Sequence, residues 1–138
     1  MAALYTAIAH ARGDGRNGEV ETGDGTLSLQ MRVPVEMGGP GGGSNPELLF
    51  AAGYATCFHS AIKVLGRKLK LDTEGSAVSA SIGIGPVESG GLGLSAALDV
   101  HLPGCTPTEA EQLVAAAHQF CPYSNATRGN IDVQITLV

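Results

Sequence analysis

The chain has 138 residues, of which 43% are hydrophobic and only 15% are charged, and it contains 20 glycines. This composition excludes a disordered chain and predicts one turn-rich globular domain over residues 1–138, because a chain of this length can bury a core without disulfide or metal staples. The formal net charge of -5 offers no basic surface for phosphates, which argues against a nucleic-acid partner.

The first predicted strand follows a tight turn at Asp24 and Gly25. Between Thr26 and Val35 every second residue is apolar, and this period of two indicates a half-buried strand. Together with the segment around Val20, the pattern predicts an N-terminal hairpin. The alternating residues are Leu27, Leu29, Met31, Val33 and Val35.

A long helix is predicted from Pro46 to about Leu69. The capping residues Ser44 and Asn45 precede Pro46, and Glu47 places a negative charge where the helix dipole favours it. Apolar residues surround the axis of this helix, which predicts burial on most of its sides. The helix contains Cys57.

Three later segments alternate as strands do, and turn residues bound each of them, as in antiparallel strands that are joined by hairpins. They are residues 78–84, 92–102 and 131–137. A second helix begins at the capping box of Thr106 and Glu109 and ends at Pro122. Cys121 is therefore expected at the end of this helix, where the backbone turns toward the last strand.

These elements predict an α+β fold in which antiparallel sheets wrap around central helices. A largely apolar helix is difficult to cover with the thin, glycine-rich sheets of one short chain. A second copy of the chain would cover it, so we expect a homodimer.

The chain contains three cysteines. Whether they form structural disulfides depends on the cellular compartment of the protein. No apolar run approaches the roughly 18 to 20 residues that span a bilayer, and the N-terminus does not have the pattern of a secretion signal. We therefore expect a cytoplasmic protein without a membrane partner. In a reducing compartment, cysteines are more often catalytic, metal-binding or simply buried than paired in a structural disulfide.

The residue pattern alone leaves several roles open for these cysteines. A lone cysteine on an apolar helix, such as Cys57, is most often an inert small hydrophobe. His118 and Cys121 are three positions apart on a helix, so Cys57, His118 and Cys121 form a conceivable set of zinc ligands. His59 follows Cys57 by two positions and would point to nearly the opposite face of the helix.

Three segments resemble signature blocks of the organic hydroperoxide resistance (Ohr) branch of the OsmC/Ohr family. They are GRNGEV from Gly15, NPELLFAAGYATCFHSA from Asn45 and FCPYSNATRGNIDV from Phe120. The three blocks occur in the order and at the spacing that the family shows. The match therefore extends over nearly the whole chain.

This resemblance implies an intertwined OsmC-like homodimer with two active sites at the subunit interface. It implies that Cys57 is the peroxidatic cysteine, that Cys121 is the resolving cysteine, and that Arg16 and Glu47 activate the site. The implied substrates are organic hydroperoxides, including alkyl and fatty-acid hydroperoxides, and the implied reductant is a lipoylated protein or a small dithiol. No cofactor or metal is implied, and Cys105 has no counterpart in the motif.

Thiol chemistry independently supports these roles. The thiolate attacks the peroxide, whereas burial favours the neutral thiol, so a buried Cys57 needs a nearby cation. Arg16 remains charged and offers several donors, and Glu47 would hold its guanidinium in place. Attack converts Cys57 to a sulfenic acid, which condenses with the thiol of Cys121 to a disulfide, and an external dithiol then reduces that disulfide.

The spacing of Glu47 and Cys57 raises a geometric question. The two residues are ten positions apart, which corresponds to roughly 15 Å along a straight helix. One guanidinium cannot bridge this distance. The helix bends near Gly53, or the two residues serve a given site from different subunits, or Glu47 meets Arg16 in only one state of the loop. We favour a contribution across the dimer interface.

Two other functions fit parts of the pattern. The sister OsmC type of peroxidase uses a broader range of peroxides, and the segments FCPYS and ATCFHSA favour the Ohr type over it. A non-catalytic dimer that binds a metal or another ligand through the same cysteines belongs to a different functional class.

Overall fold

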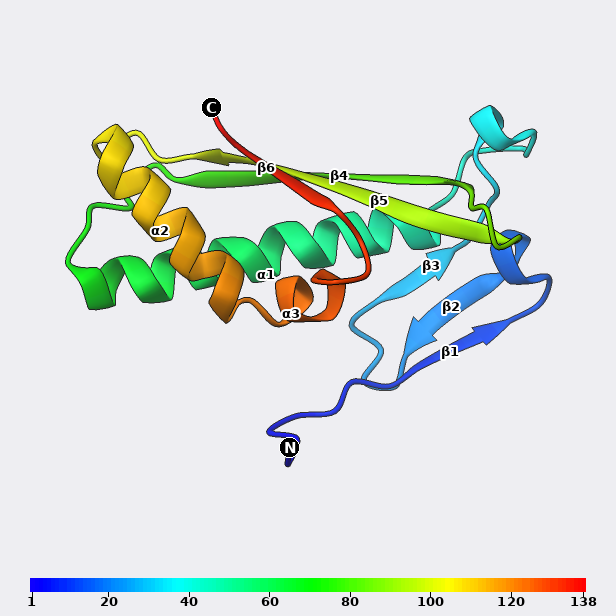
Figure 1. Ribbon diagram of the computed structural model, residues 1–138. Coiled ribbons are helices and arrows are strands. Elements are labelled where there is room, and N and C mark those ends of the chain that lie inside the picture. The colour runs from blue at the N-terminus through cyan, green and yellow to red at the C-terminus, as the bar shows by residue number, and fades with distance from the viewer. The chain divides into compact units, whose positions relative to one another are not determined.

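The computed structural model of the chain describes residues 1–138. They form two compact units, Met1–Leu49 and Phe50–Val138. The long helix α1 (Pro46–Leu69) begins at the end of the first unit and continues in the second (Figure 1).

The first unit contains a three-stranded antiparallel sheet in the order β1-β2-β3. Its strands are β1 (Ala9–Arg12), β2 (Glu19–Thr22) and β3 (Ser28–Gln30). The predicted hairpin at Asp24 and Gly25 is confirmed, since Gly25 has a φ of 73° and the Asp24 carboxylate accepts hydrogen bonds from the Thr22 and Thr26 hydroxyls.

The first unit differs from the prediction in two respects. The strand expected between Thr26 and Val35 is only three residues long, because the chain leaves the sheet at Met31, which bridges to Ser44. Pro34 has no backbone N–H to donate to a neighbouring strand, and a 3-10 turn follows it at Val35–Met37. Strand β1 was not predicted, since it is only four residues long, all of them are exposed, and its apolar positions are two alanines.

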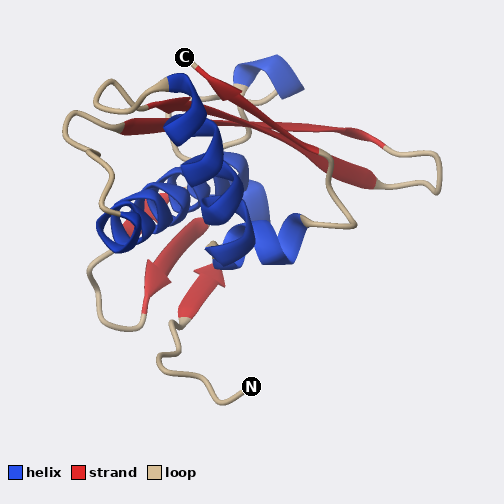
Figure 2. Cartoon of the chain, turned by 60° about the vertical axis from the view of Figure 1, so that its left-hand side comes forward, coloured by secondary structure: helices blue, strands red, loops and turns tan.

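The second unit contains a three-stranded sheet with helices on one of its faces (Figures 1 and 2). The strands are β4 (Ala77–Pro86), β5 (Leu92–His101) and β6 (Val133–Leu137), in the order β4-β5-β6. The helices are α1, α2 (Pro107–Phe120) and α3 (Pro122–Thr127). The predicted strands and both long helices are therefore confirmed.

The direction of β6 differs from the prediction. β4 and β5 pair antiparallel, as expected for a hairpin, but β6 pairs parallel with β5. The connection from β5 to β6 contains α2 and α3, and such a crossover returns the chain in the same direction as before. The capping box of α2 is confirmed, since Thr106 Oγ1 accepts from the Glu109 N–H at 3.3 Å and Glu109 Oε1 accepts from the Thr106 N–H at 2.9 Å.

The core of the second unit lies between the helices and the sheet. Its largest fully buried apolar side chains come from three elements, namely Tyr54, Phe58 and Ile62 of α1, Leu98 and Val100 of β5, and Leu113 of α2. The periodicity of α2 and the alternation of β5 direct these residues to the same interior. The hydrophobic effect therefore fixes the position of α1 in this unit.

Within the chain, helix α1 has one exposed row along its length, and the predicted burial on most of its sides, to which a second copy would contribute, stays a prediction. Ala52, Thr56 and Ser60, which lie four positions apart, are exposed, and Val64 in the same row is 38% exposed. One sheet and one crossing helix leave this row without a neighbour in the chain. By length and composition alone α1 could cross a membrane, but the core helices of globular proteins pass the same test, so one such helix is weak evidence of a span.

Candidate active site

Cys57 and Cys121 lie together in the second unit. The Cys121 thiol donates to the Cys57 sulfur, and the two Sγ atoms are 3.3 Å apart. Cys121 is completely buried, Cys57 is half-buried, and both are free thiols. A small rotation of the side chains would bring the sulfurs to the bond length of a disulfide, about 2.05 Å.

The position of Cys121 follows from the junction of two helices. Cys121 ends α2 and precedes α3, its N–H donates to the Ala117 carbonyl at 2.8 Å, and its carbonyl accepts from the Asn125 N–H at 2.9 Å. Pro122 interrupts the α2 hydrogen-bond ladder and begins α3 with the dihedral angle that a helix needs. The sequence predicted the end of α2 here but not the short α3 that follows.

Two opposing effects act on the Cys57 thiol. Burial raises the pKa of Cys57, and the backbone N–H of Tyr123, which bonds to the sulfur, lowers it. The neighbouring Cys121 thiol adds to the increase, so the pKa of Cys57 lies above the usual value for a cysteine. Within this unit the Tyr123 N–H therefore favours the thiolate, whereas burial and the neighbouring thiol favour the neutral form.

A buried polar network anchors α3. The Ser124 hydroxyl lies 2.9 Å from Tyr54 Oη and 2.8 Å from His118 Nδ1, and Thr127 Oγ1 lies 3.2 Å from the same Tyr54 hydroxyl. Tyr54 and Ser124 are completely buried. Burial lowers the pKa of His118, and the charge of Arg128 adds to this effect. The network holds α3, and with it Cys121 and the Tyr123 N–H, against α1.

Sequence reasoning left Ser124 without a role, and this network supplies one. Ser124→Ala is expected to lower the free energy of unfolding by about 1–3 kcal/mol, because the buried Tyr54 hydroxyl and the half-buried His118 ring nitrogen each lose a partner. Urea denaturation of Ser124→Ala can be compared with that of Ser79→Ala, a serine that is exposed on β4. Equal midpoints for the two variants would contradict the anchoring role.

Three aromatic rings pack together near Cys57, since Tyr54 precedes Cys57 by about one helical turn and the Tyr123 N–H bonds to the Cys57 sulfur. Phe50, Tyr54 and Tyr123 have ring centroids 5.7 to 6.2 Å apart. A Cβ atom at Gly53 would lie 2.5 Å from Tyr123 Oη, so the glycine makes room for this ring. Gly53 lies inside the continuous helix α1, and its role is therefore close packing.

Arg16 and Glu47 form a paired group in the first unit. The two terminal nitrogens of the guanidinium donate to the two carboxylate oxygens, each at 2.8 Å. Hydrogen bonding to Arg16 lowers the pKa of Glu47, and hydrogen bonding to Glu47 raises the pKa of Arg16. The pair is bidentate and charged on both sides, which is the strongest form of this interaction. The side chain of Glu47 is 13% exposed.

The loop that carries Arg16 depends on its glycines. Arg16 lies in a 3-10 turn at Gly15–Asn17, between β1 and β2. Gly15 has a φ of 54°, which favours glycine. A Cβ atom at Gly18 would lie 2.2 Å from the Arg12 carbonyl oxygen, so only glycine fits there. The GRNG segment of the sequence therefore forms one tight turn.

Cys105 takes no part in the contact between Cys57 and Cys121, and the conceivable zinc ligands do not form a metal site. Cys105 donates to the Asp72 carbonyl at 3.3 Å, and burial raises its pKa, with a smaller contribution from Glu109 and then Asp72. No group of three or more His, Cys, Asp or Glu side chains in residues 1–138 has the geometry of a metal site. Cys57, His118 and Cys121 therefore do not form the conceivable zinc set.

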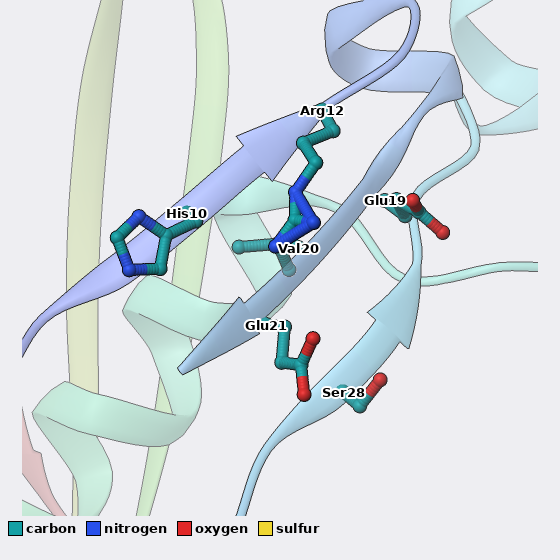
Figure 3. A pocket seen from close by; sticks show the side chains of 6 residues that line it. All are labelled: His10, Arg12, Glu19, Val20, Glu21 and Ser28. Carbon is teal, nitrogen blue, oxygen red and sulfur yellow. The ribbon is translucent and has the colours of Figure 1, made fainter. Parts of the chain in front are cut away.

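A separate pocket lies on the sheet of the first unit (Figure 3). His10, Arg12, Glu19, Val20, Glu21 and Ser28 line it, and its volume is about 60 Å³. This is far below the roughly 300–1,000 Å³ of typical ligand pockets. The side chains of His10 and Arg12 lie opposite Glu21 and Glu19 in the strand register, so cross-strand pairing accounts for them.

Comparisons with known proteins identify the family. The sequence model described as OsmC-like protein matches residues 39–136. An organic hydroperoxide resistance protein from Xanthomonas axonopodis pv. citri is 49% identical over 136 residues, which cover 97% of this chain and 94% of that protein. The chain belongs to the organic hydroperoxide resistance branch of the OsmC-like family.

Other members of this branch support the assignment. The organic hydroperoxide resistance protein OhrB from Bacillus subtilis is 40% identical over 136 residues, which cover 98% of each chain. The crystal structure of an organic hydroperoxide resistance protein from Legionella pneumophila has a TM-score of 0.94 and 49% identity, and it covers 99% of this chain and 98% of that one. The α+β OsmC-like fold that the three sequence blocks implied is confirmed.

Proposed function

We propose that this chain is a cysteine-based peroxidase that reduces organic hydroperoxides to alcohols. The observation that carries the proposal is the 3.3 Å separation of Cys57 Sγ and Cys121 Sγ. The two cysteines come from sequence segments 64 residues apart and meet at a boundary of helices beside aromatic rings. The names of the relatives supply the substrate class, because those proteins confer resistance to organic hydroperoxides.

The proposed cycle has three steps. The Cys57 thiolate attacks the outer peroxide oxygen, the O–O bond breaks, and the alkoxide leaves and takes up a proton to become the alcohol. The resulting Cys57 sulfenic acid condenses with the Cys121 thiol, which forms the disulfide and releases water. An external dithiol, carried on a lipoylated protein or supplied as a small molecule, then reduces the disulfide by exchange and is itself oxidised.

Arg16 is proposed as the cation that stabilises the thiolate. Burial raises the pKa of Cys57, and a guanidinium can offset this effect while donating to the peroxide oxygens. Glu47 is proposed to hold Arg16 in the orientation that this role requires. Because Glu47 precedes Cys57 by ten positions, or about 15 Å of helix, we propose that Arg16 serves the Cys57 of a partner subunit.

A homodimer is part of the proposal. The exposed row of Ala52, Thr56, Ser60 and Val64 on α1 has small side chains that allow another helix to approach closely, and a second copy would cover it. We propose that residues 1–138 act as one OsmC/Ohr-like domain in each subunit and that the dimer functions in the cytoplasm. No nucleic acid or membrane takes part in this function.

The first test counts thiols and compares substrates. Reduced protein treated with one equivalent of cumene hydroperoxide is expected to lose two of its three thiols, those of Cys57 and Cys121. Burial of about 100 Å² of the cumyl group at ~25 cal/mol per Å² favours it over hydrogen peroxide by roughly 70-fold in kcat/KM. A lipoylated protein would serve as the reductant in this comparison.

Two results would contradict the proposal. If all three thiols persist after peroxide is added, the cysteines do not react as proposed, and bound zinc in such a sample would favour the metal-binding class. If hydrogen peroxide is consumed as fast as cumene hydroperoxide, the aromatic surroundings of Cys57 do not select organic substrates.

A further inference from the structure

Arg32 forms a set of hydrogen bonds that joins two segments of the first unit. Its Nη1 atom lies 3.1 Å from the Asn17 carbonyl oxygen and 3.1 Å from the Gly18 carbonyl oxygen. The same nitrogen lies 2.6 Å from the Met31 carbonyl oxygen, and Nη2 donates to Gln30 Oε1 at 3.3 Å. Asn17 and Gly18 directly follow Arg16, so Arg32 holds the end of the turn that carries Arg16.

A second contact fixes the same turn. The Val33 N–H donates to Asn17 Oδ1 at 3.0 Å, and the Met31 N–H donates to the Gly18 carbonyl at 2.9 Å. The turn is therefore attached to the segment 31–33 by both side chains and backbone. The hydrogen bonds inside the turn use the Asp14 and Gly15 carbonyls, so the Asn17 carbonyl can accept from Arg32, and the Gly18 carbonyl can accept from both Arg32 and the Met31 N–H.

Arg32 is also attached to the segment that leads into α1. The backbone N–H of Arg32 donates to the Ser44 carbonyl at 2.9 Å. A Cβ atom at Gly43 would lie 2.7 Å from Arg32 Cγ, so this glycine lets the segment pack on the arginine stem. Glu47 follows in the first turn of α1. One residue thus connects the turn that carries Arg16 with the chain that carries Glu47.

We propose that Arg32 is a positioning residue, which holds the Asn17 and Gly18 carbonyls so that the Arg16 guanidinium meets the Glu47 carboxylate in the bidentate geometry. This inference rests on the proposed function, in which Arg16 activates Cys57. Arg32 itself touches neither substrate nor sulfur in this role.

The donor geometry explains why arginine is needed at this position. The guanidinium is planar and presents fixed N–H groups, so one end of it serves several carbonyls while the other end reaches Gln30. A lysine keeps the charge but has one donor nitrogen on a shorter side chain, so it has no second nitrogen for Gln30 and no planar group that fixes its donor toward the three carbonyls. Arg32→Lys therefore removes the positioning role without changing the net charge.

The test measures the reactivity of Cys57 against pH in three variants. In Arg32→Lys and in Asn17→Ala, the alkylation rate of Cys57 at neutral pH is expected to fall by about tenfold, with the inflection of the pH profile moved upward by about one pH unit. Arg12→Lys is the matched control, since Arg12 is an exposed arginine of β1 in the same unit, and it is expected to match the wild type. Arg16→Ala is measured in parallel and is expected to give the largest decrease in the alkylation rate of Cys57, because it removes the guanidinium completely.

Urea denaturation separates positioning from general stability. The Arg32→Lys and Arg12→Lys variants are both expected to remain folded and to unfold cooperatively in urea, while only Arg32→Lys changes the pH profile. The amides of Asn17 and Gly18 should also exchange hydrogen faster in Arg32→Lys, a result that does not depend on any activity.

The outcomes distinguish the inference from the function on which it rests. If Arg16→Ala is slow but Arg32→Lys and Asn17→Ala behave as the wild type, Arg32 does not position Arg16. If Arg16→Ala itself reacts as the wild type, the proposed role of Arg16 is wrong, and the inference fails with it. If Arg12→Lys is as slow as Arg32→Lys, the effect is not specific to the turn, which also overturns the inference.

Discussion

Replacing Cys57 with serine is expected to slow the consumption of organic hydroperoxides by at least about a thousandfold, because a serine hydroxyl is not ionised near neutral pH and cannot attack the peroxide oxygen as a thiolate does. Cys121→Ser is expected to behave differently. Its first reaction with peroxide should remain fast, but Cys57 then has no thiol with which to condense and is oxidised further to the sulfinic acid.

Intact mass spectrometry and stopped-flow kinetics distinguish these two variants. With cumene hydroperoxide, Cys121→Ser should gain the mass of one and then two oxygen atoms, whereas the wild type should lose two hydrogen atoms as its disulfide forms. Cys105→Ser should match the wild type, because the Cys105 thiol is bonded to the Asp72 carbonyl. Wild-type rates in Cys57→Ser would remove this cysteine from the mechanism.

Arg16→Ala is expected to slow the reaction of Cys57 with hydroperoxide by about 100-fold at neutral pH. Burial already raises the pKa of Cys57, and without the guanidinium nothing but the Tyr123 N–H opposes that effect. The thiolate fraction at neutral pH therefore decreases, and the inflection of the rate profile moves to higher pH, by about 1–3 units for a charge at contact distance. The variant should recover part of its rate as the pH is raised.

The pH dependence of the reaction with an alkylating agent measures this shift directly. Arg16→Lys keeps the charge but not the bidentate contact with Glu47, so an intermediate inflection is expected. The urea midpoint shows whether each variant remains folded. If the inflection does not move in Arg16→Ala, a different group stabilises the thiolate.

Mixed dimers test the subunit that supplies Arg16. When equal amounts of Arg16→Ala and Cys57→Ser subunits are unfolded and refolded together, half of the dimers are mixed, and each mixed dimer contains one complete site if Arg16 acts across the interface. The mixture should then regain about a quarter of the wild-type activity. If Arg16 serves the Cys57 of its own subunit, no complete site exists in any dimer and the mixture stays inactive.

The motifs of the sequence, and not its periodicity, predicted which residues far apart in the chain would lie together in the candidate site. Periodicity placed Cys57 on a helix and Cys121 at the end of another, but it left an inert thiol and a zinc set as alternatives. The three sequence blocks favoured a catalytic role, and they associate residues that are 31 or 64 positions apart and that the structure brings together, Arg16 with Glu47 and Cys57 with Cys121.

The features that the sequence did not predict depend on tertiary contacts. Helix α3 is six residues long, which is too short for a helical period to be recognised. The parallel pairing of β6 depends on how its connection crosses the sheet, which its own alternating residues do not reveal. The bonds of Ser124 with Tyr54, and those of Arg32 with Gly18, join segments whose proximity no local pattern indicates.

The unequal exposure of the two sulfurs has a consequence for regeneration of the enzyme. Cys121 has no accessible surface, whereas Cys57 is partly open to solvent. In the proposed cycle, an incoming dithiol is therefore expected to reach only the outer sulfur of the disulfide, so that the mixed disulfide forms on Cys57 and Cys121 departs as the leaving thiolate. The inner sulfur would then be shielded from bulk thiols and oxidants, and Cys57 would be its one reaction partner.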